Sequence, residues 1–179
     1  MFADLTQKEG KILLWIQDNI RNDLLTPIVK GITYLGEAGW FWILLCVVFM
    51  AWKKYRPIGL TCSASLAISF VINFILKLIV ARTRPYEAIE GLTRLVGKQS
   101  DYSFPSGHTS ASMAVSVVML ALLPRKYGVP AFVIGVLVSL SRLYVGVHYP
   151  TDVLCAAVIA VCVAICCIRF YKKKYDGEH

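Results

Sequence analysis

Hydrophobic residues along this chain are gathered into long blocks, and polar residues are concentrated in shorter segments between them. Five apolar blocks follow one another at residues 37–52, 57–80, 105–123, 128–146 and 150–170. A helix needs about 20 predominantly apolar residues to cross the hydrocarbon core of a bilayer. The pattern therefore predicts an all-α fold, a polytopic membrane bundle of about five to six transmembrane helices.

The first 36 residues follow a different pattern. Apolar side chains recur there at helical spacing, with charged residues on the other faces, at Ile12, Leu13, Trp15, Ile16 and Ile20. This amphipathic pattern is typical of a helix that lies in the membrane interface. Residues 24–35 form an apolar stretch too short to span a bilayer alone, and we expect Gly36 to end it. Asp4 and Glu9 stand where a signal peptide would carry basic residues, so no signal peptide is expected.

Basic residues predict the orientation of the bundle. If the five apolar blocks alternate in direction, one side of the membrane receives Lys53, Lys54, Arg56, Arg125, Lys126, Arg169, Lys172, Lys173 and Lys174. By the positive-inside rule that side is cytoplasmic. We therefore divide the chain into an N-terminal interfacial segment (1–36), a transmembrane catalytic domain (37–171) and a basic cytoplasmic tail (172–179).

Composition supports the membrane assignment. The 179 residues are 57% hydrophobic and 17% charged, with a mean hydropathy of +0.61, whereas soluble domains are nearer half apolar and a quarter charged. The net charge of +8 does not indicate nucleic acid as a partner, because the basic residues form short clusters between apolar blocks. All six cysteines lie inside apolar blocks without a CxxC pair, so we expect no disulfide framework.

Three polar segments at the edges of apolar blocks carry candidate chemistry. The first contains Lys77 and Arg84, seven residues apart and followed by Pro85. Two turns of helix would direct both cations to one point, which indicates a polyanion, and the proline would stop the helix. The alternative is a lysine that extends to the interface and a solvated arginine. Arg82 and Arg94 lie nearby and are interpreted as solvated side chains or head-group contacts.

The second segment is Pro105-Ser106-Gly107-His108. It is expected to open a helix, where free backbone amides and the helix dipole form a phosphate site. Gly107 would allow close approach of the backbone, Ser106 would add a hydroxyl donor, and His108 would carry a proton near neutral pH. The alternative is an ordinary helix cap followed by an interfacial histidine.

The third segment runs from Ser141-Arg142 through His148 to Asp152. The planar guanidinium of Arg142 would bind phosphate oxygens, or it marks a helix end. Asp152, one helical turn after His148, would hold Nδ1–H and leave Nε2 as a nucleophile; alone, such a pair is more often structural. Several cations at one point would repel a divalent ion, so we expect neither a metal nor a cofactor.

Together these segments read Lys-x6-Arg-Pro, Pro-Ser-Gly-His and Ser-Arg-x5-His-x3-Asp, and they resemble the signature of the type 2 phosphatidic acid phosphatase (PAP2) superfamily. The resemblance is close over residues 77–152. The family's membrane enzymes usually have six spans, whereas this chain lacks a clear first one.

The resemblance implies a mechanism. His148, oriented by Asp152, attacks phosphorus to form a phosphohistidine, and His108 protonates the leaving oxygen. The phosphate oxygens are neutralised by Lys77, Arg84, Ser106, the Gly107 amide and Arg142. The resemblance also implies a lipid phosphate or diphosphate substrate, which the predicted orientation places at the extracytoplasmic face of the cell membrane. The short connection 86–104 is expected to lie over the site. Small bacterial members similar to this chain favour undecaprenyl diphosphate, with phosphatidylglycerophosphate or phosphatidic acid as alternatives.

Two other classes must be considered, vanadium haloperoxidases, which share the signature, and non-enzymatic proteins built on the same fold. Vanadium haloperoxidases are soluble, and the five apolar blocks argue against that class. A non-enzymatic lipid-binding or transport protein on the same fold would be expected to lose His148 or Asp152, and both are present. The expected partners are therefore a lipid phosphate and membrane lipids, and the sequence does not determine an oligomeric state.

Overall fold

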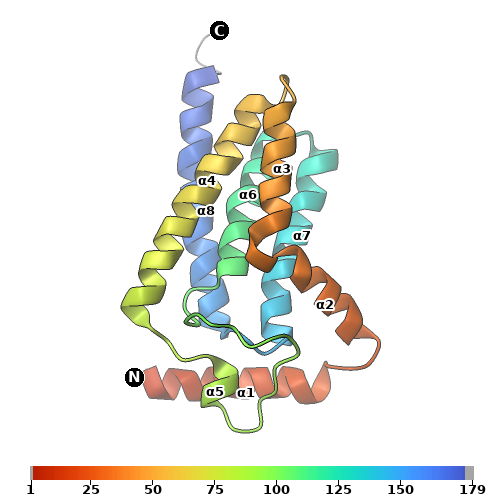
Figure 1. The fold of residues 1–179 in the computed structure, drawn as a ribbon, viewed down its shortest axis with the longest axis vertical. Helices are drawn as coiled ribbons and strands as arrows, with labels where there is room; N and C mark the ends of the chain where they lie inside the picture. Colours follow the sequence, from red (N-terminus) through yellow and green to blue (C-terminus); the bar gives the residue numbers. More distant parts are fainter. Residues whose placement is uncertain (1, 176–179) are drawn as a thin grey trace.

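The computed structural model describes residues 2–175 of the chain. Over this range the chain is helical, without strands, in the order α1 (Phe2–Asn19), α2 (Leu25–Leu35), the 3-10 turn η1 (Glu37–Gly39), α3 (Trp40–Ala51), α4 (Arg56–Val80), α5 (Pro85–Ala88), α6 (Gly107–Leu122), α7 (Arg125–Tyr144) and α8 (Pro150–Tyr175). The predicted all-α fold is confirmed. Each of the five apolar blocks contains one long helix of the bundle, in Figure 1 α3, α4, α6, α7 and α8.

Helix α6 is the centre of the bundle, since it packs against α4, α7 and α8 and also contacts α3. Small residues along it allow the neighbouring backbones to approach closely. Two hydrogen bonds join this helix to its neighbours: the indole of Trp42 on α3 donates to Ser112 Oγ at 2.8 Å, and Ser65 on α4 donates to the Ala114 carbonyl at 2.8 Å. The lipid-facing surface is apolar, with exposed side chains such as Phe70 and Leu154.

The first of the predicted spans differs in shape from the prediction. Only residues 40–51 of the block 37–52 form an α-helix, and α2 precedes it at an angle of 43°. Gly36 ends α2 as expected, and the bend follows from left-handed backbone at Ala38 (φ 47°) and Gly39 (φ 68°). By length and hydropathy, α4, α7 and α8 qualify as membrane spans, and the bent α2–α3 pair makes a fourth. At 16 residues α6 is shorter, but it lies inside the bundle.

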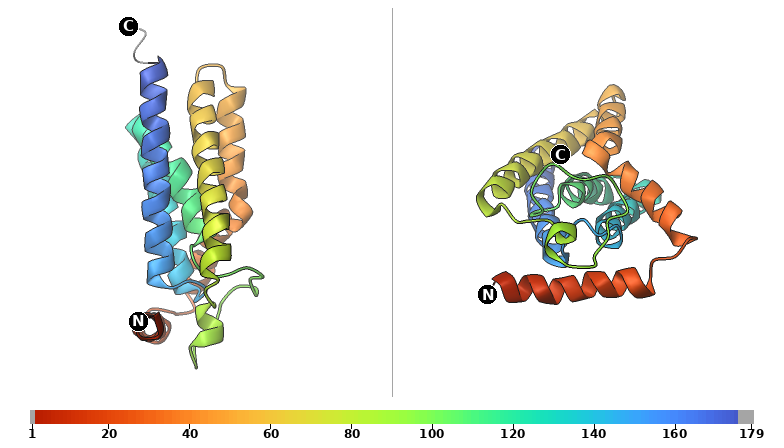
Figure 2. Two further views of the ribbon diagram at one scale, coloured as in Figure 1. Left: turned by 90° about the vertical axis from the view of Figure 1, so that its left-hand side faces the viewer. Right: turned by 60° about the horizontal axis from the view of Figure 1, so that its bottom comes forward.

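Helix α1 lies across one end of the bundle instead of running along it (Figures 1 and 2). Its inner face buries Leu13 against Leu92 and Tyr149, while Ile12 and Trp15 are exposed on other faces. This arrangement fits the predicted interfacial helix. Whether residues 1–36 form a separate unit stays a prediction, although α2 already packs against α7.

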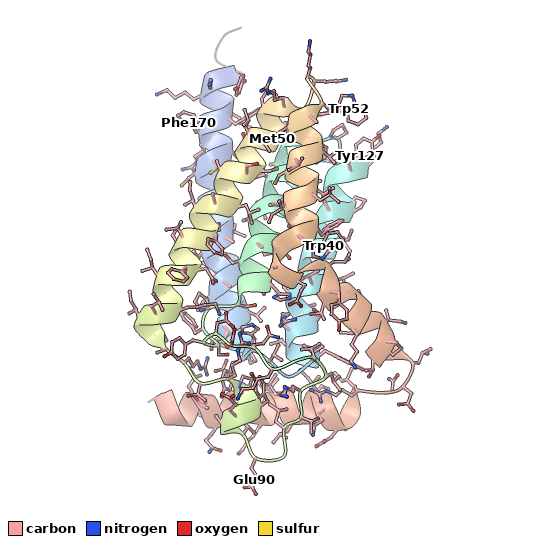
Figure 3. All side chains as sticks on the ribbon, in the orientation of Figure 1. Trp40, Met50, Trp52, Glu90, Tyr127 and Phe170 are labelled. Carbon is pink, nitrogen blue, oxygen red and sulfur yellow. The ribbon has the colours of Figure 1, made fainter. Side chains whose placement is uncertain are left out.

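The two ends of the bundle differ in charge and chemistry. Trp52, Tyr127 and Phe170 lie towards the end where α8 finishes, and Glu90 lies at the opposite end, beside α1 and α5 (Figure 3). The basic connections α3–α4 and α6–α7 lie at the end of the bundle where α8 finishes. The three polar segments with candidate chemistry lie at the opposite end, beside α1, as the alternation of the apolar blocks predicted.

Candidate active site

The three polar segments converge at the α1 end of the bundle. Each side chain is supplied by a different point of the fold: the last turn of α4 (Lys77), the residue before α5 (Arg84), the start of α6 (Ser106, Gly107, His108), the last turn of α7 (Arg142), the α7–α8 connection (His148) and the first turn of α8 (Asp152). Most are almost inaccessible, with exposed fractions of 8% for Lys77, 3% for Arg84, 1% for Arg142 and 2% for His148. The structure thus brings all the predicted site residues together, while their individual roles stay predictions.

Lys77 and Arg84 converge, but not along a helix as the sequence suggested. Helix α4 ends at Val80 because Ala81 adopts a left-handed conformation (φ 46°), and Arg84 is extended. Both cations nevertheless reach one carboxylate: Lys77 Nζ lies 2.9 Å from Asp101 Oδ2, and Arg84 Nη2 lies 2.5 Å from Oδ1. The turn after α4, and not helical periodicity, therefore forms the cation pair.

Asp101 was not anticipated, because an acidic residue in a polar connection is normally a solvated one. Burial would raise the pKa of its carboxyl, but the hydrogen bonds and charges of Lys77 and Arg84 outweigh burial and lower the pKa to about 2. Asp101 is therefore ionised at neutral pH. Its side chain is 52% exposed, so this anion lies on the cation pair at the mouth of an otherwise buried site.

The second segment begins α6, as predicted. Ser106 is the N-cap residue, and its Oγ accepts from the Thr109 amide at 3.4 Å and the Thr109 hydroxyl at 3.1 Å. The helix start directs its amides and dipole towards the other site residues. A Cβ atom at Gly107 would meet only Asn73 Oδ1, at 3.9 Å, so no protein contact requires the glycine and its proposed role towards a ligand stays a prediction.

Arg142 and His108 carry polar atoms that no described residue binds. Arg142 Nη1 donates to Thr33 Oγ1 at 2.6 Å, whereas its Nε and Nη2 are buried without a hydrogen-bond partner. His108 Nε2 is equally unpartnered, with Glu37 Oε2 at 3.8 Å. His108 lies near enough to Arg142 and Arg84 for their positive charges to act on its ring. Buried donors are rarely left unpaired, so these atoms indicate a place for an anion.

His148 has the geometry expected of a nucleophile. Its Nδ1 lies 3.5 Å from Asp152 Oδ2, and its Nε2 lies 3.4 Å from Arg84 Nη1, on the side of the cation pair. Burial lowers the pKa of His148 to about 3, although the neighbouring carboxylate of Asp152 acts in the opposite direction. The ring is therefore neutral at pH 7, with Asp152 on the Nδ1 side and Arg84 on the Nε2 side.

Asp152 is fully buried and is held by more groups than the sequence indicated. Its Oδ2 accepts from Ser103 Oγ at 2.5 Å and from the Tyr149 amide at 2.9 Å, and its Oδ1 accepts from Arg82 Nη1 at 2.7 Å. The interpretation of Arg82 as a solvated side chain was wrong, because the turn after α4 directs it beneath the start of α8, where it is 13% exposed. Arg94 is exposed beside the Tyr86 ring, as expected.

Two further expectations concern metal ions and the third histidine. Within residues 2–175, no cluster of three or more His, Cys, Asp or Glu side chains is arranged to hold a metal. His179, at the end of the given sequence, is interpreted as having no catalytic role, and it lies outside the described residues.

Comparison with known proteins gives one family. A model described as the PAP2 superfamily matches residues 59–176. The chain is 34% identical over 123 residues to an undecaprenyl-diphosphatase from Sulfolobus acidocaldarius, a match that covers 68% of this chain and 60% of that protein. It is 33% identical over 149 residues to the undecaprenyl-diphosphatase BcrC of Bacillus subtilis, which covers 83% of this chain and 76% of BcrC.

A solved structure agrees with these matches. The transmembrane PAP2-type phosphatidylglycerolphosphate phosphatase from Bacillus subtilis superimposes with a TM-score of 0.75 at 28% identity, over 96% of this chain and 87% of that one.

Proposed function

The chain belongs to the PAP2 superfamily, and on that premise we propose that it is an integral-membrane lipid phosphatase acting through a phosphohistidine intermediate. The observation that carries the proposal is the set of unpartnered buried nitrogens on Arg142 and His108 beside the neutral ring of His148. With Lys77 and Arg84 they surround one point with positive charge and donors. Positive charge and donors in this arrangement would stabilise the negative charge on the equatorial oxygens of a phosphoryl group during its transfer.

In the first step, Nε2 of His148 attacks phosphorus while Asp152 holds the Nδ1 proton. The bond from phosphorus to the leaving oxygen breaks, and that oxygen takes a proton from His108. Lys77, Arg84, Arg142, Ser106 and the Gly107 amide bind the other phosphoryl oxygens. In the second step, water gives a proton to His108, attacks phosphohistidine and releases inorganic phosphate. Positioning and preorganised charge provide most of the rate enhancement.

The substrate we favour is undecaprenyl diphosphate, converted to undecaprenyl phosphate and inorganic phosphate. The support is the naming of two relatives as undecaprenyl-diphosphatases. A second candidate is phosphatidylglycerophosphate, because the structural relative that covers nearly the whole chain acts on that class of lipid. Both substrates place a phosphate monoester or a terminal phosphoryl group at the membrane surface.

Phosphate release from purified lipids tests the proposed function. In detergent, the protein should hydrolyse undecaprenyl diphosphate with the highest kcat/KM among that lipid, phosphatidylglycerophosphate and phosphatidic acid. Chelator should leave the rate unchanged and orthovanadate should inhibit, since the site is lined by cations. Loss of activity on chelation with recovery by magnesium would contradict the mechanism, and no release from any lipid would contradict the function.

Substrate entry requires Asp101 to leave the cation pair, because the carboxylate occupies both Lys77 and Arg84. Replacing Asp101 by asparagine removes the competing charge without changing the size of the side chain. Since the group is half exposed and screened by solvent, we expect orthovanadate to bind roughly tenfold more tightly, about 1.4 kcal/mol. The measurement is the inhibition constant of orthovanadate.

The matched control for this variant is Glu87→Gln. Glu87 belongs to the same connection between α4 and α6, but its carboxylate pairs with the exposed Lys98 at 3.0 Å. Glu87→Gln should leave the inhibition constant of orthovanadate unchanged. If Asp101→Asn weakens orthovanadate binding instead, Asp101 orients the cations and does not compete with the ligand.

The site is proposed to face the extracytoplasmic side of the cell membrane. The support is the charge asymmetry, since the basic connections share the end of the bundle opposite the site. A cysteine replacing Glu90, which is exposed beside α5, should react with an impermeant thiol reagent on intact cells, in a background without the native cysteines. A cysteine replacing Lys54 should react only after lysis. The reverse labelling pattern would place the site in the cytoplasm.

A further inference from the structure

Glu9 is a buried carboxylate that the proposed reaction does not use. It lies on α1, outside the bundle, yet it is only 4% exposed. Its Oε2 lies 2.7 Å from Arg82 Nη2, and its Oε1 accepts from the Thr151 amide in the first turn of α8 at 2.6 Å. Buried charges of this kind require partners, so Glu9 and Arg82 depend on each other.

Arg82 connects Glu9 to the candidate catalytic pair. Its Nη1 donates to Asp152 Oδ1 at 2.7 Å and to Thr151 Oγ1 at 2.8 Å. The guanidinium also stacks on Tyr149, 3.7 Å from the ring centroid. The residues on the C-terminal side of His148, from Tyr149 to Asp152, are thus fixed by one arginine, and that arginine is fixed by α1.

Three charged side chains of alternating sign, Glu9, Arg82 and Asp152, form a line that ends at the neutral ring of His148. In a phosphohistidine formed at Nε2, the ring keeps its Nδ1 proton and gains positive character, so Asp152 must stay ionised and keep Oδ2 towards the ring. Arg82 binds Oδ1 and leaves Oδ2 facing Nδ1. Glu9 balances the charge of Arg82, which would otherwise draw the carboxylate away from the histidine.

We propose that Glu9, acting through Arg82, is a positioning residue for the His148–Asp152 pair, so that α1 is part of the catalytic apparatus. The proposal rests on the proposed function for the role of His148. A simple tether for α1 is available elsewhere: Gln17 Oε1 accepts from the Thr93 amide at 2.8 Å, and Gln17 Nε2 donates to the Gly91 carbonyl at 3.1 Å. None of the hydrogen bonds of Gln17 involves Asp152, which makes it a matched control.

The kinetic test compares Glu9→Gln and Arg82→Gln with Gln17→Ala on the best lipid substrate. Displacement of a reacting group by about 1 Å can cost roughly 100-fold, so we expect kcat to fall by about 10- to 100-fold in the first two variants with little change in KM. Gln17→Ala should keep the wild-type kcat. A fall in kcat of the same size in Gln17→Ala would show that the α1 contacts act only as a tether and overturn the proposal.

A second measurement does not depend on turnover. Protein labelled with 15N-histidine gives ring signals that report the tautomer of each histidine, and His148→Gln identifies the signals of His148. We expect Glu9→Gln and Arg82→Gln to shift both ring nitrogens of His148, and Gln17→Ala to leave them in place. Unshifted His148 signals in the two variants would overturn the positioning role, even if kcat falls. If the wild-type protein has no lipid phosphatase activity but Glu9→Gln and Arg82→Gln still shift the His148 signals, the connection from Glu9 to His148 is supported. Only the proposed function is then rejected.

Discussion

His148→Ala should abolish turnover of every substrate, whatever its leaving group. The reason is that Nε2 of His148 is the proposed nucleophile, and its Nδ1 faces the fully buried carboxylate of Asp152 at 3.5 Å. The carboxylate near His108 belongs to the exposed Glu37 and lies 3.8 Å from Nε2, the nitrogen proposed to meet the leaving oxygen. The neutral ring and the neighbouring cation pair are both needed for attack on phosphorus. Phosphate release should fall to the background rate for lipid phosphates and for aryl phosphates alike.

The intermediate provides the direct evidence. Rapid quenching of the wild-type protein with 32P-labelled substrate should trap a label that is stable in base and labile in acid, and His148→Ala should trap none. His179→Ala removes the third histidine of the chain and should label like the wild type. Label on His108 would reverse the assignment of the two histidines, and the absence of label under all quench conditions would favour direct attack by water.

His108→Ala should have the second largest effect, and its size should depend on the leaving group. His108 begins α6 beside Arg142 and Arg84, where its Nε2 can meet the leaving oxygen. General acid catalysis commonly contributes about 10²- to 10⁴-fold, and we expect a loss of that size with a lipid phosphate. The loss should shrink with p-nitrophenyl phosphate, if it is accepted, because a good leaving group needs no proton.

The same variant should accumulate phosphoenzyme, since the attack of water on phosphohistidine also needs a base. A matched control is Glu37→Gln, which removes the carboxylate 3.8 Å from His108 Nε2 but keeps the ring. In Glu37→Gln the rate of phosphate release should depend on the leaving group as it does in the wild type. Equal losses for lipid and aryl phosphates in His108→Ala would show that His108 binds substrate and does not transfer the proton.

The sequence predicted the bundle and the site residues for a physical reason. Charged or polar residues such as Lys77, Arg142 and Asp152 at the edges of apolar blocks are costly, and a shared function for them is the simplest explanation. The local backbone geometry could not be predicted from the sequence in the same way. The left-handed turn at Ala81 carries no sequence signal, so Arg84 was placed on the preceding helix and Arg82 in solvent.

The supporting residues were missed because each lies where polar residues are expected. Glu9 reaches Arg82 across 73 residues of sequence, and Asp101 reaches Arg84 across 17. Nothing in a polar connection or an amphipathic helix shows which carboxylate turns inward. Thr33 is different, because a polar residue within the short apolar stretch 24–35 carried a weak signal, and it binds Arg142.

The position of α1 has a consequence for how the rate of this protein depends on its substrate. The helix lies across the end of the bundle that holds the site, with Ile12 and Trp15 exposed. If it lies in the membrane interface, as its amphipathic pattern predicts, the mouth of the site is at the level of the lipid head groups, and a substrate with a long hydrocarbon tail reaches it by lateral diffusion within one leaflet. The concentration that governs saturation is then the mole fraction of substrate in the bilayer or micelle, and diluting the surface with inert lipid lowers the rate even when the bulk concentration is constant.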